Sequence, residues 1–129
     1  TLRTIKNKCN ITKINESVYS FGNTISEKFD VVFCGAIIHW VFSLTADFRS
    51  FNSIISYLIS LTNKLLIIEW IDPNDGAIKL LNHIKKRRKE TDEEYNTHNF
   101  ENAIKKVSTI ISKENADCST RTIYVLEKL

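Results

Sequence analysis

Two short runs of apolar residues constrain the fold of this 129-residue chain more than any other feature. The first run, 29–35, reads Phe-Asp-Val-Val-Phe-Cys-Gly, and the second, 65–71, reads Leu-Leu-Ile-Ile-Glu-Trp-Ile. Both carry β-branched and aromatic residues at successive positions, a pattern typical of strands that are buried on both faces within a parallel sheet. The sequence therefore predicts two parallel strands, and Gly35 would let the backbone approach a ligand closely at the carboxyl end of the first.

Between the two runs, apolar residues recur every three or four positions, which is the spacing of one face of an α-helix. They are Phe48, Phe51, Ile54, Ile55, Leu58, Ile59 and Leu61. Asp47 or Thr45 can cap the start of this helix, because each side chain offers an oxygen to backbone N–H groups that lack a partner in the first turn. Strand, helix and strand at this spacing form a βαβ unit with a right-handed crossover.

The remaining segments complete an α/β domain. We expect a short strand that ends near Glu16, a loop over 19–28, a helix over 77–89 and a short helix that begins at 98. Residues 106–113 either continue that last helix or form a strand, and 121–126 form a strong final strand. A hairpin after an α/β unit would place antiparallel strands at the edge of the sheet.

Composition narrows the class of protein. Hydrophobic residues make up 43% of the chain and charged residues 26%, which is ordinary for a globular protein, and the formal charge of +3 does not by itself argue for nucleic acid. No apolar run approaches the roughly 18 residues needed to cross a bilayer. The three cysteines, Cys9, Cys34 and Cys118, are far apart and form no zinc-binding spacing, so we expect a reducing, cytoplasmic location and no metal.

Five consecutive cations at 85–89 end the predicted helix over 77–89. They suggest a nucleic-acid patch, but four acidic residues follow between 90 and 94, and cations also stabilise the C-terminus of a helix. A solvated segment that neutralises its own charge is the favoured interpretation. Nucleic-acid binding is the weaker alternative.

With these elements placed, the chain resembles a class I S-adenosylmethionine-dependent methyltransferase. Phe29-Asp30-Val31-Val32, running into Ala36-Ile37-Ile38-His39-Trp40, is similar to the family's fourth strand and the loop after it. Residues 65–70 look like the fifth strand, and 106–126 look like the antiparallel sixth and seventh strands. The resemblance covers nearly the whole chain from residue 10 onward. It implies an α/β fold: a partial Rossmann-like sheet with parallel strands and a C-terminal antiparallel hairpin.

The chain departs from the family at the cofactor. The family's glycine-rich loop, which cradles the methionine part of S-adenosylmethionine, has no counterpart, because Gly22, Gly35 and Gly76 are the only glycines. The acidic residue that grips the ribose hydroxyls is also missing. The chain opens on Thr1 and contains no methionine. We therefore expect 1–129 to be a single, partial methyltransferase-like domain, a fragment that is inactive alone and whose complete form binds S-adenosylmethionine.

Five residues are expected near the cofactor by this resemblance. Glu16 and Ser17 would meet the adenine edge, with a carboxylate that accepts and a backbone N–H that donates, although Asn15 competes and Glu16 would otherwise be a loop acid in solvent. Cys34, Gly35 and Ala36 would line the cofactor through backbone atoms. The alternative for these three is helix–strand packing, with Cys34 a small buried hydrophobe rather than a nucleophile.

The acceptor side is expected at the next two strand ends. His39 and Trp40 would face the acceptor, with His39 as general base or orienting group, and Glu69 would be the second catalytic residue. Trp70 and Asp72 would complete the substrate-binding wall. The alternatives are a core or capping role for His39, core packing for Trp40, and an Asx-type turn for Asp72. Arg121 would pair with an acid or a substrate carboxylate, or face solvent at the sheet edge.

Two functions from different classes follow. The first is a methyltransferase that moves the sulfonium methyl group to an unidentified acceptor, with a small molecule favoured. The second is a non-catalytic, truncated methyltransferase-like module that acts through homo-oligomerisation or partner binding, because an open apolar sheet edge recruits partners.

Overall fold

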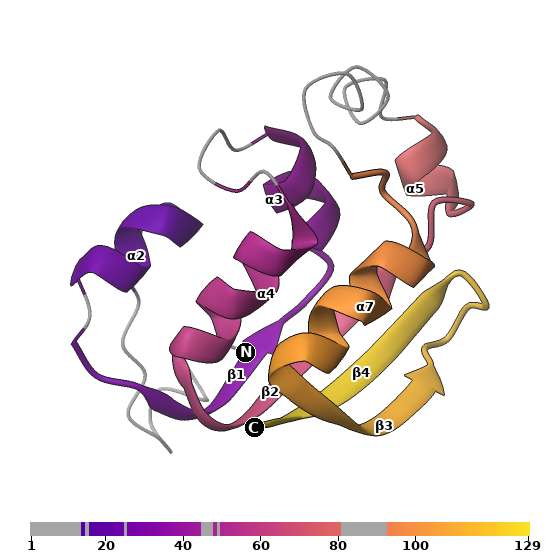
Figure 1. The fold of residues 1–129 in the computed structure, drawn as a ribbon. Coiled ribbons are helices and arrows are strands. Elements are labelled where there is room, and N and C mark those ends of the chain that lie inside the picture. The colour runs from indigo at the N-terminus through magenta and orange to yellow at the C-terminus, as the bar shows by residue number, and fades with distance from the viewer. Residues whose placement is uncertain (1–13, 15, 25, 45–47, 49, 81–92) are drawn as a thin grey trace, which may run out of the picture.

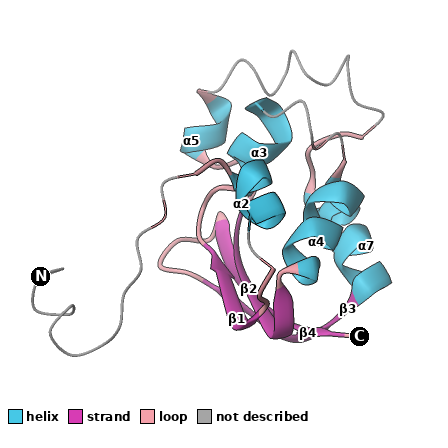
Figure 2. Cartoon of the chain, turned by 90° about the vertical axis from the view of Figure 1, so that its left-hand side faces the viewer, coloured by secondary structure: helices cyan, strands magenta, loops and turns pink. Residues whose placement is uncertain are grey.

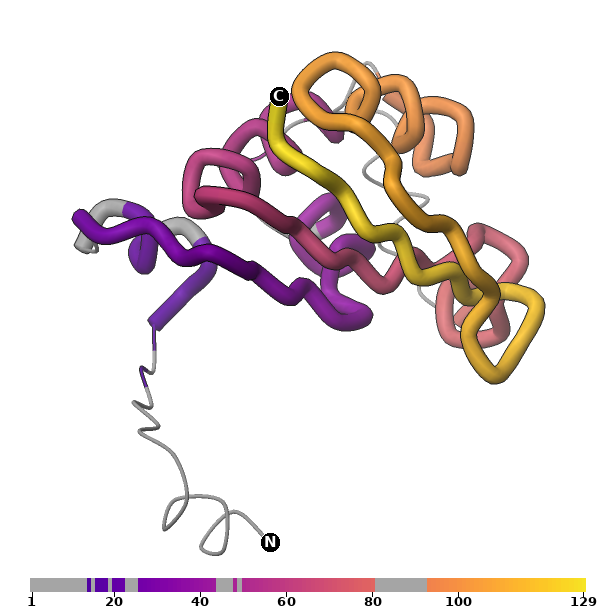
Figure 3. The backbone as a smooth tube through the Cα atoms, turned by 90° about the horizontal axis from the view of Figure 1, so that it is seen from below, coloured from indigo at the N-terminus to yellow at the C-terminus, as the bar shows by residue number. Residues whose placement is uncertain are grey.

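The computed structural model describes residues 14, 16–24, 26–44, 48, 50–80 and 93–129. The predicted strand before Glu16, most of the predicted helix over 77–89 and its basic end at 85–89 lie outside the described residues. The described strands are β1 (Phe29–Cys34), β2 (Thr62–Ile71), β3 (Ser108–Asn115) and β4 (Arg121–Lys128). They form one sheet in the order β1-β2-β4-β3 (Figures 1 and 3).

The pairing of these strands confirms the predicted fold class. β1 and β2 are parallel, with Val31 opposite Leu65 and Phe33 opposite Ile67. β4 is antiparallel to both β2 and β3, and it lies between them. The fold is therefore α/β, a partial Rossmann-like sheet in which a parallel pair is extended by a C-terminal antiparallel hairpin.

The described helices are α2 (Val18–Thr24), α3 (Ile38–Leu44), α4 (Phe51–Ser60), α5 (Gly76–Lys79) and α7 (Thr97–Val107). Helices α4 and α7 lie side by side over one face of the sheet (Figures 1 and 2). α7 ends at Val107 and β3 begins at Ser108, which decides between the two interpretations of 106–113. The Ser50 side chain caps the start of α4 and forms a reciprocal capping box with Ser53, so neither Asp47 nor Thr45 is the capping residue.

The core between sheet and helices is a cluster of aromatic rings. The Trp70 ring on β2 stacks on the rings of Phe100 and Tyr95, with centroid separations of 4.2 and 4.7 Å. Phe51 on α4 meets Trp70 edge-on at 5.7 Å. Such rings supply most of the apolar area that a small core buries. The cluster joins α4, α7 and β2.

The expectation that β1 is buried on both faces is wrong. Phe29, Val31 and Phe33 share one face of the strand and are 39%, 51% and 65% exposed. On the other face, Cys34 is 3% exposed. The reason is that β1 lies at an edge of the described sheet and that α4 and α7 cover only one of the sheet's faces.

The prediction of a loop over 19–28 is also wrong in its first part, where α2 forms. The Ser17 hydroxyl accepts a hydrogen bond from the backbone N–H of Ser20 at 3.1 Å, as an N-terminal cap does. The Tyr57 hydroxyl accepts from the Gly22 N–H at 2.8 Å and donates to the Val18 carbonyl. A Cβ atom at Gly22 would lie 2.4 Å from the Tyr57 ring, so any other residue here would require the Tyr57 side chain to shift. A tertiary contact, invisible in the local sequence, holds this helix.

Candidate functional site

The carboxyl ends of β1 and β2 lie at the same edge of the sheet, because the two strands are parallel. Gly35 follows β1 directly, and a Cβ atom built on it would lie 2.7 Å from Phe33 Cε1 and 3.7 Å from Glu69 Oε2. A side chain at 35 would therefore have to displace the Phe33 ring, and its absence lets this ring and the Glu69 carboxylate lie close to the backbone at the end of β1. These groups lie where ligands bind in open α/β sheets.

Ala36 holds an unusual backbone conformation in the turn between β1 and α3. Its φ of 45° lies in the left-handed region, and no other non-glycine residue in the described part of the chain has a positive φ. The conformation costs roughly 1–2 kcal/mol for a residue with a Cβ atom. Strain of this kind often concentrates at functional turns, and here it is next to Gly35 at the carboxyl end of β1.

Replacing Ala36 tests this strain. Ala36→Val should lower the free energy of unfolding by about 1–3 kcal/mol, because a β-branched residue at positive φ is strongly disfavoured. Ala36→Gly should stay within about 1 kcal/mol of the wild type, since relief of strain offsets the added freedom of the unfolded chain. Urea denaturation measures both. Ala116→Val, at a position of negative φ, is the matched control, and an equal loss there would contradict the assignment of strain to Ala36.

Glu69 belongs to a charged network that crosses from β2 to β4. Arg121 Nη1 lies 3.5 Å from Glu69 Oε1, and Arg121 Nε lies 3.4 Å from Asp75 Oδ2. Asp75 also accepts from the Thr120 hydroxyl at 2.7 Å and from the Ala77 N–H at 2.8 Å. The network holds one Glu69 oxygen against Arg121 while the other, Oε2, lies beside Gly35. An acid or a substrate carboxylate was predicted as the partner of Arg121, and the structure shows acidic partners, Glu69 and Asp75.

The sequence analysis did not identify Asp75 as part of this site. It is buried at 6% exposure and caps α5, a role that its place in a Pro-Asn-Asp-Gly turn suggests only weakly. The hydrogen bond from Thr120, and then that from the Ala77 N–H, lowers the pKa of the Asp75 carboxyl, and Arg121 adds to the effect. Conversely, Asp75 raises the pKa of Arg121. The partners come from 45 residues away, which explains why local sequence did not reveal them.

The lowered pKa of Asp75 predicts how stability depends on pH. A carboxyl whose folded-state pKa is depressed stabilises the fold at pH values above its unfolded value, ordinarily 3.8, and this contribution is lost as pH falls through the folded-state pKa. Asp75→Asn should therefore reduce the difference in unfolding free energy between pH 7 and about pH 3. Asp117→Asn, an exposed aspartate before β4, is the control. An Asp75→Asn protein with the full wild-type difference would contradict this assignment.

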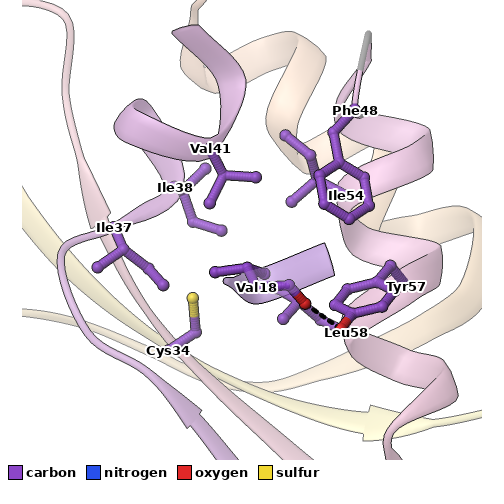
Figure 4. Close-up of a pocket in the computed structure, with 9 residues that line it drawn as sticks. All are labelled: Val18, Cys34, Ile37, Ile38, Val41, Phe48, Ile54, Tyr57 and Leu58. Carbon is purple, nitrogen blue, oxygen red and sulfur yellow. Dashed lines mark hydrogen bonds between the residues drawn. The ribbon is translucent and has the colours of Figure 1, made fainter. Parts of the chain in front are cut away.

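The Cys34 side chain has a structural role. Burial raises the pKa of its thiol to about 12, so the thiolate that a nucleophile requires is not formed near neutral pH. Its Sγ points into a small apolar hollow beside α2, α3 and α4 (Figure 4). The hollow is lined by Val18, Cys34, Ile37, Ile38, Val41, Phe48, Ile54, Tyr57 and Leu58. A charged cofactor would find almost no polar partner there, so the hollow is packing space.

The two residues predicted to meet adenine lie at the start of α2. Glu16 is exposed, and Ser17 makes its hydrogen bonds with Ser20. Val18, the next residue, lines the same hollow as Cys34, which places the start of α2 beside the end of β1 (Figure 4). The contacts of Glu16 and Ser17 with a cofactor stay predictions.

His39 and Trp40 occupy the first turn of α3 and differ in exposure. The Trp40 side chain is 41% exposed, so it is not the core residue that the alternative interpretation required. His39 is only 4% exposed, and its ring centroid lies 5.2 Å from that of Trp40. Trp40 is thus the one of the pair that can contact a molecule in solution. The catalytic role of His39 stays a prediction.

Trp70 and Asp72 have structural roles. Trp70 is 1% exposed within the aromatic core, and its indole N–H donates to the Thr97 hydroxyl at 3.1 Å. Asp72 Oδ1 accepts from the Asn74 backbone N–H at 2.8 Å, the Asx-type turn that was the alternative interpretation. The buried position of Trp70 argues against the predicted contact with an acceptor. Of the predicted residues, the structure places Glu69 beside Gly35, and the roles of Ala36 and Trp40 stay predictions.

No helix in the described part of the chain is both long and apolar enough to span a membrane. Nor do the described residues contain a group of three or more His, Cys, Asp or Glu side chains placed to hold a metal ion.

Comparisons with known proteins give a likeness among solved structures only. No family profile and no curated protein sequence matches the chain. Among solved structures, the chain is similar to magnesium protoporphyrin IX methyltransferase from Synechocystis with bound SAH, at 15% sequence identity and a TM-score of 0.49. The likeness covers 82% of this chain and 46% of that one, so the chain spans less than half the length of the solved structure. At this identity the likeness concerns the fold alone.

Proposed function

We propose that this chain forms the acceptor-side part of an S-adenosylmethionine-dependent methyltransferase domain and that the methyl acceptor is a small molecule. The observation that carries the proposal is the position of Gly35, a residue without a side chain, at the carboxyl ends of two parallel strands and beside the Glu69 carboxylate. The inserted antiparallel strand β4, which carries Arg121, supports it further, because the resemblance to class I methyltransferases implied such a hairpin.

The cofactor would supply a methyl group on a sulfonium centre, which an acceptor atom can displace in line. The chain's own residues would align the reactants, and alignment accounts for most of the catalysis that methyl transfer to a good nucleophile needs. The Gly35 and Ala36 backbone would lie against the cofactor, since a glycine lets a ligand approach the backbone closely. Cys34 would contribute through its backbone alone, because its thiol points away into the apolar hollow.

The acceptor would lie between Glu69 and Trp40. Arg121 fixes Glu69 through Oε1, so that Oε2 can accept a hydrogen bond from a hydroxyl or amine of the acceptor. The exposed Trp40 ring offers a flat apolar surface of the kind that small-molecule sites use. Glu69 and Trp40 are therefore the residues that would hold and orient the acceptor.

A calorimetric titration of the full native polypeptide with S-adenosylhomocysteine tests the proposal. We expect saturable binding to one site, weakened at least tenfold, or about 1.4 kcal/mol, by Gly35→Val. Gly76→Val is the matched control, because a Cβ atom at Gly76 would meet no other atom within 4 Å. Absence of binding by the wild-type polypeptide, or an equal loss in the two variants, would contradict the proposal.

A further inference from the structure

The end of β1 brings an aromatic ring and a carboxylate to one point. Phe33 Cε1 and Glu69 Oε2 lie 2.7 and 3.7 Å from the position that a Cβ atom of residue 35 would take. The two side chains share a face of the sheet, because Phe33 pairs with Ile67, two residues before Glu69 on β2. Phe33 is 65% exposed, so much of its ring is open to solvent. A ligand at this edge of the sheet would meet the ring and the carboxylate together.

Arg121 holds the Glu69 carboxylate by one of its two oxygens. Arg121 Nη1 lies 3.5 Å from Glu69 Oε1, whereas Oε2 is the oxygen beside Gly35. The Glu69 side chain is 21% exposed, so a ligand can reach it while its orientation stays fixed. A carboxylate oxygen accepts hydrogen bonds and donates none when the group is ionised, so the ligand must carry a donor.

The charges beside Phe33 and Glu69 favour a cationic donor. Two carboxylates share Arg121, since Arg121 Nε lies 3.4 Å from Asp75 Oδ2. Glu69, Asp75 and Arg121 together therefore carry an excess of negative charge. An anionic ligand would find the guanidinium already paired. A hydroxyl would gain one hydrogen bond to Oε2, but an ammonium group supplies a positive charge as well, and oppositely charged partners form the shorter and stronger hydrogen bonds.

The Phe33 ring adds a second attraction for a cation. The face of an aromatic ring attracts an ammonium group within roughly 6 Å of the ring centre. An ammonium nitrogen about 2.8 Å from Glu69 Oε2 can lie within this distance of the Phe33 ring, because both groups surround the same point beside Gly35. The ring and the carboxylate therefore suit the same chemical group.

We propose that Phe33 and Glu69 bind the ammonium group of a small organic amine and that this amine is the methyl acceptor. Binding of the amine needs no cofactor, so only the second half of the inference rests on the proposed function. For transfer, one proton passes from the ammonium group to Glu69 Oε2, which later releases it to water. The nitrogen lone pair then forms the new carbon–nitrogen bond as the carbon–sulfur bond of the sulfonium centre breaks and leaves its electron pair on sulfur.

A titration of the full native polypeptide with benzylammonium chloride, followed by backbone amide resonances at Gly35 and Glu69, tests the binding. Benzyl alcohol and sodium benzoate, at the same ionic strength, are neutral and anionic probes of similar shape. Benzylammonium should bind about tenfold or more tightly than benzyl alcohol, and benzoate should not bind. Glu69→Gln should weaken benzylammonium binding about tenfold, and Phe33→Leu should weaken it about two- to fivefold.

Glu127→Gln is the matched control, because Glu127 is exposed on β4 and pairs with Leu65, far along β2 from Glu69. It should leave the binding unchanged. Equal affinities for the ammonium and the alcohol, or equal losses in Glu69→Gln and Glu127→Gln, would overturn the inference. Circular dichroism checks the fold of Glu69→Gln, which loses a partner of Arg121. Unchanged binding by Phe33→Leu, a substitution at an exposed position, would overturn the inference independently of that variant.

A parallel titration with S-adenosylhomocysteine separates this inference from the proposed function. Binding of S-adenosylhomocysteine without binding of benzylammonium would overturn the ammonium site and leave the proposed function standing. Binding of benzylammonium without binding of S-adenosylhomocysteine would support the ammonium site and overturn the role of the amine as methyl acceptor.

Discussion

Trp70→Ala should destabilise the fold by about 3–5 kcal/mol, the usual cost of removing a large buried aromatic ring. The Trp70 ring is 1% exposed and stacks between Tyr95 and Phe100. Its loss would leave a cavity where α4, α7 and β2 meet, and the neighbouring rings can fill that cavity only in part. The native stability of a domain is commonly 5–15 kcal/mol, so a loss of this size removes a large share of it.

The other tryptophan provides the control for this prediction. Trp40 is 41% exposed on α3, so Trp40→Ala should cost less than about 1 kcal/mol. Urea denaturation followed by circular dichroism measures both variants without relying on tryptophan fluorescence. If Trp40→Ala were as destabilising as Trp70→Ala, the described core would be wrong.

Leu66→Lys should abolish stable folding, with a loss of at least about 4 kcal/mol. Leu66 is fully buried on the face of β2 that α4 and α7 cover, and a lysine there would lose its hydration without gaining a partner. Val31→Lys introduces the same residue on the neighbouring strand, but on the open face, and should cost less than about 1 kcal/mol.

This pair of variants tests whether one face of the sheet is covered and the other open. Thermal unfolding by calorimetry gives both values. Equal destabilisation by Leu66→Lys and Val31→Lys would show that the exposed face of β1 is buried in solution.

Much of the sheet could be predicted from the sequence, because its strands are marked by local composition. The apolar runs at 29–35 and 65–71 predicted β1 and β2, and the strong strand pattern at 121–126 predicted β4. The burial of β1 could not be predicted. Phe29, Val31 and Phe33 have the composition of a strand in the middle of a sheet, but composition does not say whether helices lie over a given face.

The candidate site was predicted in part. Gly35 and Glu69 lie together, as expected for the ends of parallel strands. Asp75 was missed because its partners, Thr120 and Arg121, come from the C-terminal hairpin, and Trp70 was misplaced because position 70 is on the helix-covered face of β2. Side chains of β2 alternate between the helix-covered face and the open face, and tertiary packing decides which of them face the helices. This choice alone places Trp70 on the helix-covered face and Glu69 on the other.

The most direct test of the central claim is to locate the ligand on the chain. Backbone amide resonances of the full native polypeptide, followed during titration with S-adenosylhomocysteine, should shift most at Gly35, Ala36 and Glu69. The amides of β3, on the far side of the sheet, should stay unchanged. Shifts confined to other parts of the chain, or none at saturating ligand, would contradict the assignment of the cofactor site to the carboxyl ends of β1 and β2.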